Sequence, residues 1–335
     1  MTNLRWGLIG ASDIAATSII PAIRAHGSTV GAVFSRSAAR GAEYAEKHEI
    51  PKSFDDLHGL LSDGVDAVYV STTNERHHEE TLEAAAAGKH VLCEKPLALS
   101  LDAAADMVRA CRTAGVVMAT NHGRRHDGGL RAAREVVRSG RLGTIISART
   151  SNAVELPERL RGWRLTDVSA GAGVVLDLVV HEADTLRFVL DQDPVQVTAL
   201  TGSHGMASGE VEDEVMGVLR MGSGLLASYA CSFITPCGHV GLDVNGTEAS
   251  LSVQRVPGHE PTAVLRHRSG HEDIPLPEGE PLGHATVRAF EAAVRGEGEP
   301  TASGEDGLRS LAVALASLES ARSRQTVTLD SFSNR

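Results

Sequence analysis

The sequence lacks the features that mark membrane proteins and nucleic-acid binders. Its 335 residues contain no apolar run of about 18 or more, so we expect no membrane-spanning segment. The formal charge of −11 argues against nucleic acid as a partner, because such proteins usually carry a basic face. Met1 to Arg5 leads directly into an apolar run, which leaves no room for a signal peptide. These absences together favour a cytoplasmic protein.

Cysteine is also scarce, and none of the cysteines is spaced as C-x-x-C. The four are Cys93, Cys111, Cys231 and Cys237. We expect reduced thiols rather than a disulfide framework or a zinc site. The histidines fit no metal-ligand spacing either, so no metal is expected. Those considered are His77, His78, His126, His204, His239 and His259.

What the sequence does contain, over residues 1–121, is a regular alternation of strands and helices. The expected strands are residues 6–9, 30–34, 65–70, 90–93 and 116–119. The expected helices between them are residues 13–25, 38–48, 54–61, 75–87 and 101–114. This alternation predicts an α/β domain with a doubly wound parallel sheet, because crossovers between parallel strands are right-handed.

Residues 122–335 follow a different pattern. Strand-like runs occur at residues 145–151, 195–201, 215–221, 225–233, 239–245, 250–253 and 263–266. Helices are expected at residues 128–139, 179–190, 284–295 and 304–323, and a loop at residues 268–283. The spacing of the strands predicts an α+β domain with a large, mostly antiparallel open sheet. The chain is long enough for two domains, which we place at residues 1–121 and 122–335.

The turn after the first strand predicts a dinucleotide site. Residues 7–15 read GLIGASDIA, where Gly10, Ser12 and Ala15 occupy the positions of the G-x-G-x-x-A motif. Gly10 permits the tight turn and Ala15 allows close packing, while Ser12 replaces the glycine under the pyrophosphate. We expect the phosphates to bind at Gly10, Ala11, Ser12, Asp13 and Ile14, at the start of a helix. The alternative is an ordinary tight turn.

The end of the second strand favours NADP(H) over NAD(H). An acidic residue that would bind the ribose 2′-hydroxyl is missing there, and the chain has Ser35, Arg36 and Arg40 instead. Guanidinium groups bind a 2′-phosphate with several donors. The alternative is that Arg36 and Arg40 are solvated residues at a helix start.

Polar residues also follow the other strands of the expected parallel sheet. Thr72, Thr73, Asn74 and His77 follow one strand, Glu94-Lys95-Pro96 the next, and Asn121 and His122 the last. Ligands of doubly wound sheets bind outside these carboxyl ends, so we expect contacts with cofactor or substrate. Helix capping by Thr73 or Asn74 is the structural alternative. For Glu94-Lys95-Pro96 the alternative is an edge turn with a solvated ion pair.

A second candidate site is the segment DLVVH, residues 177–181. Asp177 lies four residues before His181, and Asp184 three residues after it, so each pair shares a helical face. A carboxylate on one imidazole nitrogen sets the tautomer and favours the protonated ring. Such a histidine is a good proton donor. The alternative is an aspartate that caps the helix above a packed histidine.

These motifs resemble those of the Gfo/Idh/MocA family (glucose–fructose oxidoreductase, inositol dehydrogenase and rhizopine catabolism). GLIGASDIA, EKP and DLVVH match in order and spacing, and the resemblance covers nearly the whole chain. It implies NADPH-dependent hydride transfer to the ketone of a sugar ring, such as 1,5-anhydro-D-fructose, which gives 1,5-anhydro-D-mannitol. Oxidation of a polyol or sugar with NAD(P), and a glycosidase of the same fold with bound NAD, are the alternatives.

The resemblance also implies roles for individual residues. Lys95 and His181 are expected to be catalytic, with Asp177 orienting the histidine or binding a substrate hydroxyl. Glu94 is expected to hold the cofactor or the lysine, and Trp163-Arg164 to close over cofactor and substrate unless Trp163 is an ordinary loop anchor. The expected substrate contacts are Lys95, His122, Trp163, Asp177 and His181. Residues 123–126, which are more basic than the family pattern, are expected to face the sugar. A monomer, or a homo-oligomer formed through the second sheet, is expected.

Overall fold

The computed structural model describes residues 3–329 and divides the chain into two compact units. The first unit comprises Met1–Gly123 and Glu280–Leu308, and the second comprises Arg124–Gly279 and Arg309–Arg335. The first division, after Gly123, lies two residues from the expected boundary at residue 121. The segment Glu280–Leu308 differs from the expectation, because it clusters with the first unit rather than the second.

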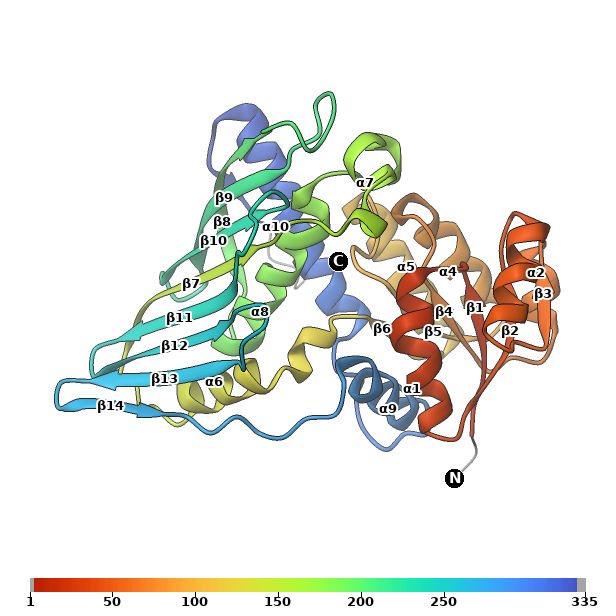
Figure 1. Ribbon diagram of the computed structural model, residues 1–335, viewed down its shortest axis with the longest axis horizontal. Coiled ribbons are helices and arrows are strands. Elements are labelled where there is room, and N and C mark those ends of the chain that lie inside the picture. Colours follow the sequence, from red (N-terminus) through yellow and green to blue (C-terminus); the bar gives the residue numbers. More distant parts are fainter. Residues whose placement is uncertain (1–2, 330–335) are drawn as a thin grey trace. The chain divides into compact units, whose positions relative to one another are not determined.

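The first unit contains a six-stranded sheet in the order β3-β2-β1-β4-β5-β6, with every neighbouring pair parallel. Its strands are β1 (Arg5–Ile9), β2 (Thr29–Phe34), β3 (Lys52–Phe54), β4 (Ala67–Val70), β5 (His90–Cys93) and β6 (Met118–Thr120). Its helices are η1 (Ala15–Ile19), α1 (Ile20–Ala25), α2 (Ala38–Lys47), α3 (Leu57–Ser62), η2 (Asn74–Arg76), α4 (His77–Ala86), α5 (Leu101–Ala114) and α9 (Leu282–Val294). This confirms the doubly wound parallel sheet (Figure 1).

The core of the first unit explains why α9 belongs to it. Trp6 on β1 is fully buried, and its ring lies 5.0 Å from that of Phe290 on α9, centroid to centroid. The indole Nε1 donates to Glu291 at 3.0 Å. Val287 and Phe290 are part of the same buried cluster as the strands. Burial of a large apolar side chain stabilises a fold by about 1.5–3 kcal/mol. The contact of Phe290 with Trp6 therefore explains why α9 packs with β1 although the two are far apart in the sequence.

The helix after β1 is not regular. The sequence predicts one helix over residues 13–25, whereas the structure has a π-helical turn, η1, followed by α1. Pro21 stands at the start of α1 and has no N–H to donate to the preceding turn, which fits an irregular junction there. The helix expected at residues 54–61 is likewise a short strand, β3, followed by α3, which Asp56 caps by accepting from Gly59 N at 2.8 Å.

The second unit contains a nine-stranded sheet in the order β14-β13-β12-β11-β7-β10-β9-β8-β15. Its strands are β7 (Ile145–Ala153), β8 (Pro194–Gly202), β9 (Glu214–Met221), β10 (Leu226–Ser232), β11 (Val240–Gly246), β12 (Ala249–Arg255), β13 (Thr262–His267), β14 (Gly270–Asp273) and β15 (Val327–Thr328). The pairs are antiparallel except β7 with β10, which confirms the expected mostly antiparallel sheet. β14 lies in the expected loop, where its four exposed residues carry no apolar alternation.

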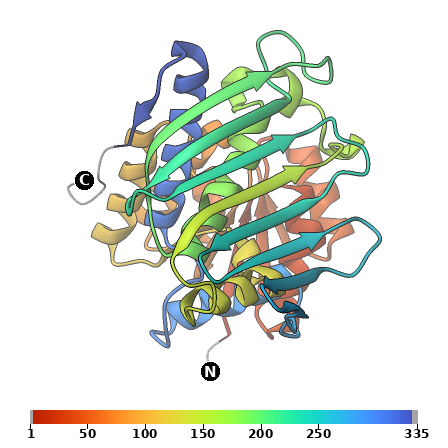
Figure 2. The same cartoon turned by 90° about the vertical axis from the view of Figure 1, so that its left-hand side faces the viewer.

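One face of this sheet packs against helices, and the other is open. The remaining helices are η3 (Gly123–His126), α6 (Gly128–Arg138), η4 (Glu158–Leu160), α7 (Trp163–Thr166), η5 (Val168–Ala170), η6 (Val175–Val179), α8 (Val180–Leu190) and α10 (Gly304–Ser323), which crosses the boundary between the units. α6 contacts β12 and β13, and α8 contacts β7. Figure 2 looks onto the opposite face, and among residues 3–329 no helix lies in front of the sheet in this view.

The exposed side of the sheet carries large apolar side chains. We call this surface the open face and define it by Leu200, Met216, Val218 and Leu226, which are 48–69% exposed. Burial alternates along β9, as expected for a strand with one covered side. None of the helices in residues 3–329 has both the length and the apolar character that a bilayer span requires.

Candidate active site

The turn after β1 requires glycine at residue 10. Gly10 has φ +111°, and its N–H donates to the carbonyl oxygen of Phe34 at 3.1 Å. A Cβ atom there would lie 3.0 Å from the backbone of Ser71 and Thr72, after β4. The turn is therefore packed directly against the neighbouring strand end, as the predicted dinucleotide turn requires. This backbone cradle fits the phosphates of a nicotinamide dinucleotide.

Ser12 has a structural use that accounts for its replacing a glycine. Its hydroxyl accepts from Ala15 N at 3.1 Å and lies 2.8 Å from the hydroxyl of Ser71. One of the two serine hydroxyls donates to the other, so the accepting hydroxyl keeps its own hydrogen for a phosphate oxygen. The Ser12 carbonyl accepts from Tyr44 at 2.8 Å. Burial, with Asp13 nearby, raises the pKa of Tyr44 to about 12.

The two arginines after β2 differ in what they contact. Arg40 Nη2 donates to the carbonyl oxygen of Ala11 at 2.8 Å, so this residue braces the glycine turn. Ser37 caps α2 by accepting from Arg40 N at 3.3 Å. Ser35 is buried and Arg36 is exposed. Arg36 is therefore the better placed of the two to bind an additional phosphate.

The polar residues after β4 are used partly inside the unit. Thr72 Oγ1 donates to Glu80, and Thr73 Oγ1 donates to Glu75 at 2.6 Å. Thr73 precedes η2 without a capping hydrogen bond from its side chain, so the capping interpretation is wrong for Thr73. Glu80 is buried, and this burial raises its pKa.

His77 lies in the interior rather than at a ligand-facing surface. It is fully buried, with Nδ1 at 3.0 Å from the carbonyl oxygen of Pro96 and Nε2 at 3.3 Å from that of Thr72. Burial lowers its pKa. The sequence places His77 among the cofactor contacts, but in the structure its ring joins the segments after β4 and β5.

The carboxylate of Glu94 is the centre of a polar cluster at the ends of β4, β5 and β6. Its Oε1 accepts from the Tyr69 hydroxyl and from Asn121 Nδ2, and its Oε2 accepts from Lys95 N at 3.3 Å. Burial, followed by the charge of Glu94, raises the pKa of Tyr69. The Lys95–Pro96 peptide is cis. Glu94 thus anchors the backbone that carries Lys95, which is half-buried.

Tyr69 is the member of this cluster that the sequence analysis missed. Its position as the one polar side chain within the apolar run Ala67–Val70 was the available signal. His122, by contrast, lies where it was expected, directly after the same sheet edge, and is 1% exposed. Its backbone N–H donates to the carbonyl oxygen of Thr120 at 2.7 Å.

In the second unit, three of the expected site residues lie together. The Arg164 guanidinium lies 4.5 Å from the centroid of the Trp163 ring, and its Nε lies 3.7 Å from Asp177 Oδ1. Asp177 belongs to the π-helical turn η6, and no side chain caps its N-terminus. The interpretation of Asp177 as a helix cap is therefore wrong. His181 follows in α8 and is half-buried.

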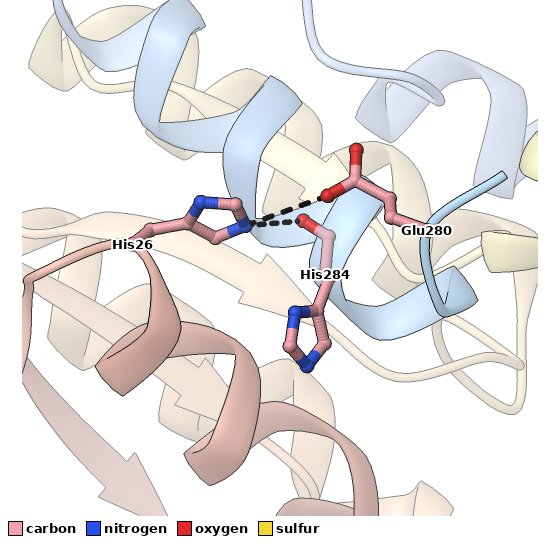
Figure 3. Close-up of side chains that lie close together, drawn as sticks. All are labelled: His26, Glu280 and His284. Atoms are coloured by element: carbon pink, nitrogen blue, oxygen red, sulfur yellow. Dashed lines mark hydrogen bonds and ion pairs between the residues drawn. The ribbon is translucent and has the colours of Figure 1, made fainter.

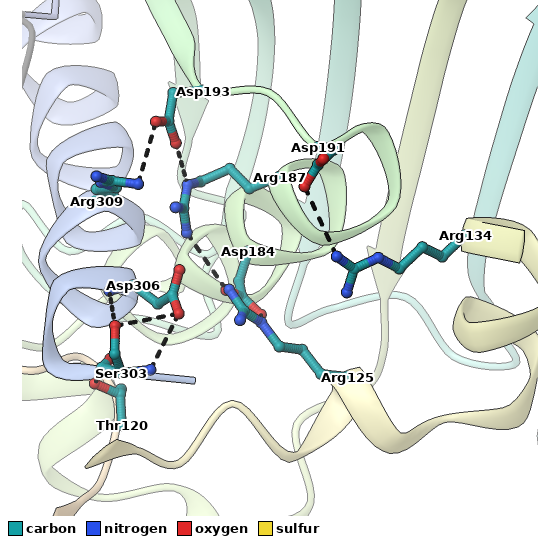
Figure 4. A network of polar contacts seen from close by, with 10 residues as sticks. All are labelled: Thr120, Arg125, Arg134, Asp184, Arg187, Asp191, Asp193, Ser303, Asp306 and Arg309. Carbon is teal, nitrogen blue, oxygen red and sulfur yellow. Dashed lines mark hydrogen bonds and ion pairs between the residues drawn. The ribbon is translucent and has the colours of Figure 1, made fainter. Parts of the chain in front are cut away.

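Asp184, whose spacing places it on the same helical face as His181, contacts two arginines. Its carboxylate accepts from Arg125 Nε at 3.0 Å and Nη2 at 2.6 Å, and lies 3.7 Å from Arg187 (Figure 4). Arg187 also pairs with Asp193 at 2.6 Å, and Asp193 with Arg309 at 3.4 Å. Asp184 therefore belongs to a network that fixes α8, the helix that carries His181.

Glu182, the residue after His181, was missed by the sequence analysis. It is fully buried and accepts from Arg124 and from Asn152 Nδ2, the latter at 3.1 Å. The basic residues at 123–126 were expected to face a sugar, but Arg124 and Arg125 instead pair with carboxylates of α8. The available signal was Glu182 among the apolar residues of α8, because a buried carboxylate needs a positively charged partner such as these arginines.

Figure 3 shows a group of two histidines and a glutamate, of which one histidine is far from the other two residues in the sequence. Ligand atoms of His26, Glu280 and His284 lie within 4.8 Å of one another, close enough for a cation. His26 Nε2 lies 3.0 Å from the carbonyl oxygen of His284 and 3.8 Å from Glu280. Glu280 also pairs with Arg288 at 2.6 Å. These contacts fix the start of α9 against α1.

Comparison with known proteins places these features in a family. Residues 4–122 match the model of the oxidoreductase family with an NAD-binding Rossmann fold, and residues 130–252 match the GFO/IDH/MocA C-terminal domain. The chain is 48% identical over 329 residues to 1,5-anhydro-D-fructose reductase of Ensifer adhaerens, covering 97% of this chain and 98% of the relative.

Two further relatives share nearly the full length. D-xylose 1-dehydrogenase (NADP(+)) 2 of Haloferax volcanii is 30% identical and covers 98% of this chain and 100% of its own. The crystal structure of aldose-aldose oxidoreductase from Caulobacter crescentus, complexed with glycerol, has a TM-score of 0.87 at 25% identity, with 98% and 100% of the two chains covered. The chain belongs to the Gfo/Idh/MocA family of oxidoreductases.

Proposed function

We propose that this oxidoreductase uses NADPH to reduce the ketone of 1,5-anhydro-D-fructose to 1,5-anhydro-D-mannitol. The observation that carries the proposal is the 48% identity over nearly the whole chain to a reductase of that name. The glycine turn at Gly10, packed against Ser71, and the anchored lysine segment after β5 supply the parts that such a reaction needs.

The first unit would hold the cofactor. The backbone from Gly10 to Ile14, with the paired hydroxyls of Ser12 and Ser71, would bind the phosphates. Arg36, exposed after β2, would bind the 2′-phosphate, because a guanidinium offers several donors in one plane. Further cofactor contacts are proposed for Ser35, Arg40, Thr72, Thr73, Asn74, Glu94, Lys95, Asn121, Trp163 and Arg164. When bound, the nicotinamide supplies the hydride.

Lys95 and His181 would act on the substrate oxygen. The lysine ammonium would donate a hydrogen bond to the ketone oxygen and stabilise the negative charge that develops there. The His181 imidazolium would give that oxygen a proton as the carbon becomes a secondary alcohol, and solvent would reprotonate the ring. Asp177, fixed against Arg164, would bind a substrate hydroxyl or orient His181. His122 and Trp163 would contact the sugar.

The first test is NADPH oxidation in the presence of 1,5-anhydro-D-fructose, with the product identified by mass spectrometry. Lys95→Ala and His181→Ala should each lower kcat by about 10²–10⁴-fold, because each removes proton transfer or charge stabilisation. Lys47→Ala, at an exposed position at the end of α2, is the control and should keep the activity. Undiminished turnover in either active-site variant would contradict its assigned role.

Cofactor choice has its own test. Arg36→Ala should raise the Kd for NADPH by about tenfold and leave that for NADH unchanged, because only NADPH has the 2′-phosphate. Arg40→Ala should weaken the binding of both NADPH and NADH. Arg40 holds the Ala11 carbonyl oxygen, and the turn around Ala11 would bind the phosphates that the two cofactors have in common. Equal losses in Arg36→Ala would mean that Arg36 does not bind the 2′-phosphate.

We further propose that the protein is cytosolic and that any self-association uses the open face. All four cysteines are free, as suits a reducing compartment. Contiguous exposed apolar side chains such as Leu200 and Met216 are typical of interaction surfaces. Sedimentation equilibrium of wild-type protein and Leu200→Lys/Met216→Lys tests this. A dimer that persists in the variant would place the interface elsewhere.

A further inference from the structure

The second unit contains a pocket, separate from the proposed catalytic residues, in which arginine is the most frequent lining residue. It has a volume of about 610 Å³, within the range of small-molecule sites. Four arginines line it: Arg131, Arg134, Arg138 and Arg141. Three of them recur at three- and four-residue spacing on α6, so they share one helical face, and Arg141 follows in the next turn.

Most of the remaining lining of the pocket is apolar. The Arg134 guanidinium lies over the ring of Phe188 from α8, with its central carbon 4.3 Å from the ring centroid. Ile274, Pro275 and Pro277, after β14, form the opposite side. This segment is close to α6, since a Cβ on Gly128 would lie 3.0 Å from the Pro277 carbonyl oxygen. Ile274 N also donates to the Ala263 carbonyl oxygen at 2.8 Å.

The protein's own carboxylates neutralise these arginines incompletely. Arg134 and Arg138 both approach Asp191, but at 3.7 and 4.0 Å, beyond ordinary hydrogen-bond length (Figure 4 shows the Arg134 contact). Arg141 pairs with Glu272. Among the ion pairs found within residues 3–329, those of this pocket involve Arg134, Arg138 and Arg141, and none involves Arg131. With Glu135 included, four positive groups face three negative ones, on a chain whose formal charge is −11.

We propose that this pocket binds a small phosphorylated metabolite with two anionic groups, of sugar-bisphosphate or nucleoside-diphosphate size. Like charges along one helix face destabilise the helix, and an anion bound between them relieves that repulsion. Guanidinium groups bind phosphate oxygens with paired donors, and Phe188 holds one of them in place through a cation–π contact. A net local charge of only about +1 suits a small anion in a concave site better than a nucleic acid, which needs a broad basic surface.

The test uses inorganic pyrophosphate as the probe, measured by isothermal titration calorimetry with and without saturating NADPH. The cofactor fills the phosphate site of the first unit, and inorganic phosphate and chloride at equal ionic strength serve as comparison anions. Wild-type protein should bind one pyrophosphate in the presence of NADPH, more tightly than phosphate. Arg131→Gln/Arg138→Gln should weaken this binding at least about tenfold, because it removes two phosphate donors.

The matched control is Arg109→Gln/Arg322→Gln, which removes two exposed arginines far from α6 in the sequence. Their side chains are 68% and 75% exposed. This control has the same change in net charge and should bind pyrophosphate within about twofold of wild type, since exposed charges act weakly at a distance. Equal losses in both double variants, or no binding by wild-type protein, would overturn the proposal. The comparison does not depend on the substrate of the reductase, so the two proposals fail separately.

Discussion

The two sheets of this protein differ in how many of their faces are buried. In the six-stranded sheet, β4 is buried at every residue and β1 at all but its first. In the nine-stranded sheet, burial alternates along β9, and the open face exposes residues such as Leu200 and Met216. Helices cover both faces of a parallel sheet, whereas an antiparallel sheet needs only one covered face.

This difference determines where polar groups can lie. A strand buried on both faces has no room for polar side chains except at its ends, which is where Glu94, Lys95 and Asn121 follow β5 and β6. In the second unit, the polar network instead lies on helices, with Asp184 and Glu182 on α8 paired to arginines before α6. The parallel sheet therefore concentrates its polar residues at one edge, and the second unit distributes them.

The largest expected effect is on the free energy of unfolding, and it compares a substitution in a buried strand with one in a strand that has an exposed face. Leu92→Ala in β5, where the side chain is fully buried, should lower the free energy of unfolding by about 2–5 kcal/mol. Leu200→Ala in β8, where the side chain is 69% exposed, should change it by less than about 0.5 kcal/mol. Urea denaturation followed by circular dichroism measures both. A comparable loss at Leu200 would mean that the open face is covered in solution.

A second prediction concerns the edge of the parallel sheet at which we propose that the cofactor binds. Gly10→Ala should cost about 1–3 kcal/mol of stability and weaken NADPH binding more than about tenfold, because φ is +111° there and Cβ would lie only 3.0 Å from the backbone of Ser71. Gly88 also has a positive φ, +70°, but no atom lies within 4 Å of the Cβ that Gly88→Ala would add. This variant should lose stability from the backbone strain while its cofactor affinity stays unchanged. Thermal denaturation and fluorescence titration separate the two effects.

The smallest effect is a pH dependence at the same edge. Burial lowers the pKa of His77 in the folded protein, so the unfolded chain takes up a proton near its ordinary pKa that the folded chain does not. Stability should therefore fall as the pH decreases below about 6.5. His77→Gln, whose amide can still donate to the Pro96 carbonyl, should flatten this slope by up to about 1.4 kcal/mol per pH unit.

Urea denaturation at several pH values between about 5 and 7.5 measures that slope. His259→Gln, at an exposed position, is the matched control and should retain the wild-type slope. If the slope of His77→Gln equals that of wild type, another group takes up the proton on unfolding.

Much of the candidate site could be predicted from local patterns. The turn at Gly10 and the polar residues after each strand follow from chain geometry over a few residues, and the structure has them at one end of the parallel sheet. The partners of those residues could not be predicted in this way. Ser12 pairs with Ser71 and Glu94 with Tyr69, and the two residues of each pair lie more than twenty positions apart in the sequence.

The sequence by itself determined the alternation of elements, the mostly antiparallel second sheet and the family motifs, because side-chain periodicity and glycine turns are local properties of the backbone. Only the tertiary structure decided that α9 packs into the core of the first unit through Phe290, and that Asp184 pairs with Arg125. The chain has 32 lysines and arginines and 43 acidic residues. Which of these groups meet depends on the packing of distant elements, since ion pairs act only over a few ångströms in water.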